Sequence, residues 1–61
     1  MSYEIAEYKY INHMKETYSL GGDLEYPSRT RSSQDSEGNW LLISEQGFKM
    51  GKVFKNGDII A

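Results

Sequence analysis

The 61-residue chain contains no cysteine, one histidine and one proline. Without cysteine it can form neither a disulfide nor a thiolate zinc site, and this composition is typical of proteins in a reducing compartment. Its first twenty residues lack an uninterrupted apolar run and include charged residues such as Glu7 and Lys15, which excludes a signal peptide or a membrane span there. We therefore predict a cytoplasmic protein that does not associate with membranes.

The shortness of the chain limits what it can build. A 61-residue chain forms one domain, residues 1–61, and buries only about 60% of the surface that its unfolded form exposes. Apolar and aromatic residues make up 38% of the composition and include five tyrosines, which is enough for one small core but leaves little to enclose a deep substrate pocket. We expect binding to another macromolecule, and association into a homodimer would reinforce so small a core.

Charge is distributed unevenly along the chain, although the net charge is only −2. Residues 1–26 hold five acidic residues against two lysines, whereas residues 47–61 hold three lysines against one aspartate. The first part is therefore acidic and the last part basic, which predicts surfaces of opposite sign.

An amphipathic helix is predicted over residues 3–19. Its apolar positions recur at spacings of three and four, with Ser2 as the N-cap and Gly21–Gly22 as the C-terminal stop. Glu7 falls within the apolar arc, so residues 7–11 are also compatible with an extended strand. The residues of the arc are Tyr3, Ala6, Tyr10, Ile11, Met14 and Tyr18.

The rest of the chain reads as an antiparallel meander. Residues 28–33 are compatible with an edge strand or with a loop, and residues 40–44 form an apolar run that predicts a central strand buried on both faces. A third strand begins at Phe48 and is broken by a β-bulge at Gly51–Lys52. Asn56-Gly57 predicts a type I′ hairpin turn before a last short strand at 59–60.

These elements predict an α+β fold in which an N-terminal helix packs on a three- to four-stranded antiparallel β-meander. No internal repeat or domain-dividing linker is evident. The predicted core consists of Tyr10, Met14, Tyr18, Trp40, Leu42, Phe48, Val53 and Ile59.

No catalytic, metal or cofactor motif is complete. His13 and Glu16 would share a helix face, but two ligands fall short of a zinc site. The stretch Gly47–Lys52 has one residue too few between its glycines for a phosphate-binding loop, and valine replaces the hydroxyl residue that follows the lysine in that motif. We therefore expect a protein that is not an enzyme and that uses no cofactor.

Tyrosines of the acidic N-terminal part favour a protein-binding surface. Tyrosine is enriched at interfaces because it contributes a large rigid surface and a polar hydroxyl, and an exposed apolar patch usually marks a binding or dimer surface. We predict a regulator or inhibitor that binds another protein, or a second copy of itself, through this acidic helix face. The residues expected at the contact are Tyr3, Glu4, Ile5, Tyr8 and Lys9.

An alternative is a nucleic-acid-binding module. Basic residues on the edge strand and the third strand would contact phosphates if they gathered on one face of the sheet, with aromatic side chains between them as stacking surfaces. The residues concerned are Arg29, Arg31, Lys49, Lys52 and Lys55.

Overall fold

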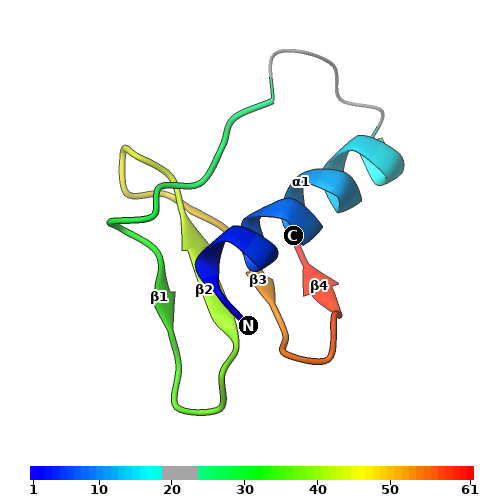
Figure 1. Cartoon of the computed structure of the whole chain (residues 1–61). Coiled ribbons are helices and arrows are strands. Elements are labelled where there is room, and N and C mark those ends of the chain that lie inside the picture. The colour runs from blue at the N-terminus through cyan, green and yellow to red at the C-terminus, as the bar shows by residue number, and fades with distance from the viewer. Residues whose placement is uncertain (19–23) are drawn as a thin grey trace.

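In the part of the chain that the structure describes, one helix lies across one face of a four-stranded antiparallel sheet (Figure 1). The computed structural model describes residues 1–18 and 24–61. The elements are α1 (Tyr3–Tyr18), β1 (Ser33–Gln34), β2 (Trp40–Ile43), β3 (Lys49–Val53) and β4 (Ile59–Ile60), and the strands lie in the order β1-β2-β3-β4. This confirms the predicted α+β fold with its N-terminal helix and antiparallel meander, and residues 7–11 are helical, so the alternative of a strand there is wrong.

Helix α1 begins as the sequence predicts. The Ser2 hydroxyl accepts a hydrogen bond from the Ile5 N–H at 3.4 Å, and the Ser2 carbonyl accepts one from the Ala6 N–H at 3.1 Å. Ser2 is therefore the N-cap, which satisfies a helix donor that would otherwise lack a partner. The predicted stop at Gly21–Gly22 lies outside the described residues.

The buried stripe of α1 is shorter than predicted. Tyr3, Ala6, Tyr10 and Ile11 are buried and Met14 packs against them, but Tyr18 is 55% exposed. A sixteen-residue helix is about 24 Å long, whereas the longest strand has five residues. The last turn of α1 therefore extends beyond the sheet (Figure 1), and the prediction that Tyr18 belongs to the core is wrong.

The strand β2 is central, as predicted, but only one of its faces is fully covered. Trp40 and Leu42 point toward α1, and Leu42 is completely buried. Leu41 and Ile43 lie on the opposite face of the sheet and are only half-buried, because the helix covers one face alone. The prediction of burial on both faces is therefore wrong for this strand.

A β-bulge occurs in β3, one residue earlier than predicted. Leu42 pairs with Gly51 and Ile43 pairs with Lys49, so that Met50 is the extra residue. The bulge lets Gly51 approach the helix, where the Tyr10 hydroxyl donates to the Met50 carbonyl at 3.3 Å. A Cβ at Gly51 would lie 2.9 Å from Tyr10 Cε1 and 2.7 Å from the Ile60 carbonyl oxygen, so only glycine fits here.

The three hairpin turns share one hydrogen-bonding pattern. In each, the fourth residue is a glycine with a φ between 91° and 100° whose N–H donates to the carbonyl of the first residue. In the last turn Gly57 donates to Phe54, so the central residues are Lys55 and Asn56. This is the arrangement of a three-residue loop with a glycine bulge, and the predicted two-residue type I′ turn centred on Asn56-Gly57 is wrong. The turns span residues 35–39, 44–48 and 54–58.

Phe48 is the second predicted core residue that lies outside the core. It closes the turn between β2 and β3, where its N–H donates to the Ser44 hydroxyl and its carbonyl accepts from the Ser44 N–H. Its side chain is 72% exposed. The strand begins only at Lys49, so the alternation that would direct Phe48 inward does not extend to it.

The expected edge strand at 28–33 is reduced to β1 and a separate contact with the end of β2. The Ser28 N–H donates to the Ile43 carbonyl, and Pro27 forms an isolated bridge with Ser44. Between these points the Ser28 carbonyl accepts from the N–H groups of Arg31 and Ser32, which closes a turn. The edge is therefore interrupted over residues 29–32.

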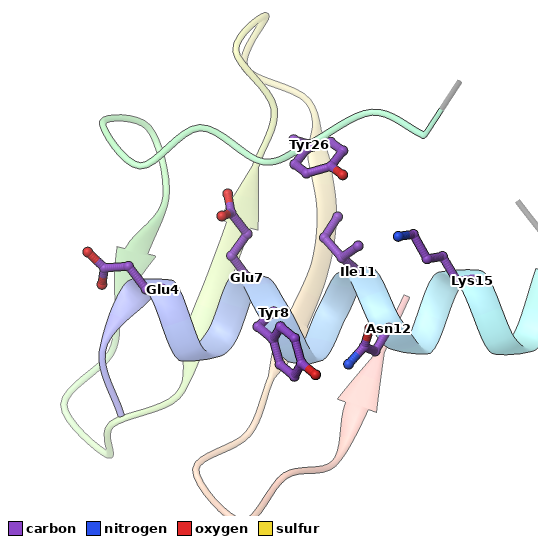
Figure 2. Close-up of a pocket in the computed structure, with 7 residues that line it drawn as sticks. All are labelled: Glu4, Glu7, Tyr8, Ile11, Asn12, Lys15 and Tyr26. Carbon is purple, nitrogen blue, oxygen red and sulfur yellow. The ribbon is translucent and has the colours of Figure 1, made fainter. Parts of the chain in front are cut away.

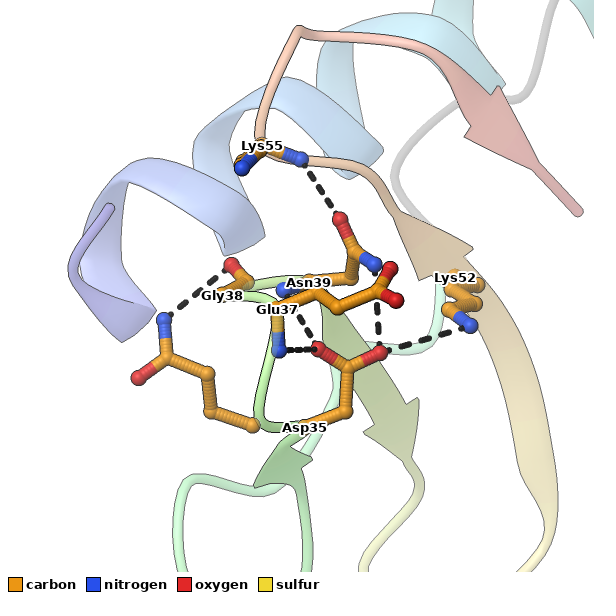
Figure 3. A network of polar contacts seen from close by, with 7 residues as sticks. Asp35, Glu37, Gly38, Asn39, Lys52 and Lys55 are labelled. Carbon is orange, nitrogen blue, oxygen red and sulfur yellow. Dashed lines mark hydrogen bonds and ion pairs between the residues drawn. The ribbon is translucent and has the colours of Figure 1, made fainter.

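A buried asparagine connects two of the turns (Figure 3). Asn39 is 5% exposed; its side-chain NH₂ donates to Asp35 Oδ2 at 3.1 Å and its side-chain Oδ1 accepts from the Lys55 N–H at 3.0 Å. Asp35 Oδ1 also accepts from the N–H groups of Glu37 and Asn39, each at 2.9 Å. The network holds the β1–β2 and β3–β4 turns together at the same end of the sheet.

Candidate protein-binding groove

A groove of about 360 Å³ lies between the outer side of α1 and the segment that leads into the sheet (Figure 2). We call it the helix groove. Its middle is apolar and aromatic, and charged groups stand at both of its ends. The residues that line it are Glu4, Glu7, Tyr8, Ile11, Asn12, Lys15 and Tyr26.

The second wall of the groove is the segment that carries Tyr26, and the residues after Tyr26 contact both the helix and the sheet. The Tyr3 hydroxyl lies 2.8 Å from the Pro27 carbonyl oxygen, and the Arg29 guanidinium forms an ion pair with Glu4. The Arg29 guanidinium also lies over the Tyr3 ring, 5.8 Å from its centroid. Together with the Ser28 bond to β2, these contacts fix residues 27–29 between α1 and the sheet.

Exposed aromatic rings flank a buried floor. Ile11 is 7% exposed at the floor, whereas Tyr8 and Tyr26 are 68% and 56% exposed. In Figure 2 Tyr26 lies over Ile11, and Tyr8 projects from the helix beside it. Large apolar side chains left this exposed around a hollow are the feature most typical of a binding surface.

The structure places the five residues of the predicted protein contact in three settings. Glu4 and Tyr8 line the helix groove. Ile5 and Lys9 are exposed on α1 outside it, with Ile5 49% exposed. Tyr3 is only 6% exposed, because it packs edge-on against Trp40 with ring centroids 5.7 Å apart. Tyr3 therefore supports the groove from the core and is not available at its surface.

Two ionisable groups at the acidic end of the groove are perturbed. The backbone N–H of Glu4 and the neighbouring Arg29 side chain lower the pKa of the Glu4 carboxyl. Burial raises the pKa of the Tyr3 hydroxyl, and its hydrogen bond to Glu7 raises that pKa further. The Glu4 carboxyl is therefore ionised and paired with Arg29. The Tyr3 hydroxyl remains a neutral hydrogen-bond donor over the physiological pH range.

Sequence reasoning missed five of the residues that line the groove. Three of them follow a regular spacing, since Glu7, Ile11 and Lys15 lie four residues apart on the helix and therefore form one row. That row was detectable, because Glu7 interrupts the predicted apolar arc. Tyr26 carried no such signal, because its position depends on contacts that the following residues make with α1 and β2. The missed residues are Glu7, Ile11, Asn12, Lys15 and Tyr26.

The basic residues of the nucleic-acid alternative do not gather on one face. Arg29 pairs with Glu4 on the helix side, and Arg31 lies next to Gly47 at the β2–β3 turn. Lys55 belongs to the β3–β4 turn at the opposite end of the sheet (Figure 1). Lys52 lies on the uncovered face, 3.5 Å from Asp35 Oδ2 and 5.1 Å from the Phe54 ring centroid.

The uncovered face of the sheet has a shallow apolar hollow of about 280 Å³. Leu41, Met50 and Ile60 line it together with the side chains of Lys49 and Lys52. Ile60 is 61% exposed. Two of the five basic residues of the alternative thus border this hollow, and the other three lie elsewhere.

Within residues 1–18 and 24–61 no three histidine, cysteine, aspartate or glutamate side chains are grouped so as to hold a metal ion. Over the same residues, α1 is too short and too polar to cross a bilayer. No protein-family model, curated protein or solved structure matches the chain.

Proposed function

We propose that this chain is a small non-catalytic protein that binds another protein through the helix groove and regulates or inhibits it. The observation that carries the proposal is the pair of exposed rings, Tyr8 and Tyr26, on either side of a hollow whose floor is the buried Ile11. Such rings contribute a large contact area at little cost in conformational entropy. We expect it to act in the cytoplasm, because it contains no cysteine.

Contacts within the chain support this proposal. The hydrogen bond from Tyr3 to Pro27 and the ion pair between Arg29 and Glu4 hold the residues that follow Tyr26 against α1 before any partner arrives. A preformed surface loses less conformational entropy on binding than a mobile one. Ile5, 49% exposed on the next face of α1, extends the apolar surface beyond the groove.

The test is affinity capture from an extract of cells that naturally contain this chain, with point variants compared in parallel. Tyr8→Ala and Ile5→Ala each remove an exposed apolar side chain, and Ser36→Ala in the exposed β1–β2 turn is the matched control. We expect a protein that wild type and Ser36→Ala retain equally, that Tyr8→Ala loses, and that stays bound as salt is raised.

Capture of the same proteins by wild type, Tyr8→Ala and Ile5→Ala would contradict the proposal. Circular dichroism spectra of the variants should match that of the wild type, because both side chains are largely exposed and their removal leaves the core intact. A lost partner would then report on the surface and not on folding.

A further inference from the structure

The helix groove carries opposite charges at its two ends. Glu7, Ile11 and Lys15 form a row along α1, with an acid, an apolar residue and a base in that order (Figure 2). The two charged positions are eight apart in the sequence, which at 1.5 Å per residue corresponds to about 12 Å along the helix. The groove is therefore polarised along its length.

At the acidic end, Glu7 has acceptor capacity to spare. Its Oε2 lies 2.8 Å from the Tyr3 hydroxyl, and a carboxylate offers about four lone-pair positions in all. Glu4, the other acid at this end, already pairs with Arg29. Glu7 is thus the carboxylate with which an arriving cation would pair, and the half-buried setting of this residue strengthens such a pair.

The middle of the groove favours an apolar side chain. Ile11 provides a floor and the rings of Tyr8 and Tyr26 provide walls, while Lys15 is exposed at the far end. In an extended chain, residues i, i+2 and i+4 point to the same side, and four residues span about 13 Å. This length matches the separation of Glu7 and Lys15.

We infer that the helix groove takes an extended segment of a partner protein with a basic residue at one position, an apolar residue two positions along and an acidic residue four positions along. The basic side chain pairs with Glu7, the apolar one lies between Tyr8 and Tyr26, and the acidic one pairs with Lys15. The inference rests on the proposed function, and it specifies the chemistry of the partner at the same site.

Selection of peptides from a random twelve-residue display library, with the folded full-length chain as bait, tests this pattern. For the wild type we expect enrichment of peptides with opposite charges four residues apart and an apolar residue midway. For Lys15→Glu, in which both ends are acidic, we expect two basic residues at the same spacing. Lys49→Glu makes the same charge change on β3, away from the groove, and should select the wild-type pattern.

Affinities of one enriched peptide then give the size of the effect. Lys15→Glu should weaken its binding by about two- to five-fold, as expected for one exposed ion pair, and Tyr8→Ala should abolish it. Lys49→Glu should leave it unchanged. Both lysines are exposed, so neither change should unfold the chain.

Three results would overturn the inference, and they differ in what they say of the proposed function. Peptides that depend on Tyr8 but lack the charge pattern would refute the inference alone. Peptides whose binding is indifferent to Tyr8→Ala would refute both. Concentration-dependent dimerisation that Tyr8→Ala abolishes, seen by sedimentation, would assign the groove to a second copy of the chain.

Discussion

The Tyr3 hydroxyl lies 2.8 Å from both the Pro27 carbonyl oxygen and Glu7 Oε2. It has one proton and can donate to only one of these acceptors at a time. Tyr3 is buried beneath the ion pair of Arg29 with Glu4. A single hydroxyl therefore links the first turn of α1 to the second wall of the helix groove.

Tyr3→Phe should lower the free energy of unfolding by about 0.5–1.5 kcal/mol, because it removes this hydrogen bond and keeps the ring. Urea denaturation measures the difference. Tyr8→Phe removes a hydroxyl from a 68% exposed ring and should leave the midpoint unchanged. Equal midpoints for Tyr3→Phe and the wild type would show that the hydroxyl contributes nothing to stability.

Alkaline pH should destabilise the wild type through the same residue. Burial, and then the hydrogen bond to Glu7, raise the pKa of Tyr3 in the folded state. The unfolded chain therefore releases this proton first, and the free energy of unfolding falls as pH rises above about 10. In Tyr3→Phe this part of the decline should be absent. Urea midpoints measured between pH 8 and pH 11 give the comparison.

Gly51→Ala should destabilise the fold by about 1–3 kcal/mol, the usual cost of overpacking a filled site. The new Cβ would lie 2.7 Å from the Ile60 carbonyl oxygen and 2.9 Å from Tyr10 Cε1, so that β4 or the Tyr10 ring must move. Thermal unfolding measures the loss. Ser36→Ala, in an exposed turn, is the control. A melting temperature equal to that of the wild type would mean that α1 does not pack on β3 at this distance.

Acid should loosen the two turns that Asn39 joins. The backbone N–H of Asn39, its side-chain amide and the Glu37 N–H lower the pKa of the Asp35 carboxyl in the folded state. Its contribution to stability is present above its unfolded value of about 3.9 and is lost as pH falls through the lower folded value. Asp35→Asn should reduce stability at pH 7 and flatten this acidic decline. Denaturation between pH 2 and pH 7 tests both expectations, and an unchanged pH profile would exclude Asp35 as their source.

Local patterns in the sequence predicted the elements and their order. Ser2 and the three-and-four spacing predicted α1, and glycines bounding short apolar runs predicted the meander, since both depend on neighbours in the chain. The core prediction that failed depends instead on how long the facing helix and sheet are. Tyr18 has the right spacing for the core, but the sheet ends before it.

The candidate site was only partly predictable for the same reason. Exposure of Ile5 and Tyr8 follows from the helical wheel, and the structure confirms it. The burial of Tyr3 depends on Trp40 and Pro27, which are distant in sequence. Tyr26 lines the groove because the next residues are fastened to α1 and β2. Such long-range contacts leave no periodic signal in a single sequence.

Nucleic-acid binding should be undetectable. A basic surface binds phosphates when several lysines and arginines face the same way, and each phosphate contact releases counterions and so adds to the salt dependence of the affinity. Here Arg29 is paired with Glu4, Lys52 lies close to Asp35, and Lys55 stands at the opposite end of the sheet from Arg31. We expect no saturable change in fluorescence anisotropy when mixed-sequence single- or double-stranded oligonucleotides are titrated at low salt.

Binding that saturates and weakens steeply with salt would instead favour a phosphate-binding role. The variants Lys49→Ala and Lys52→Ala would then show whether the uncovered face of the sheet is responsible.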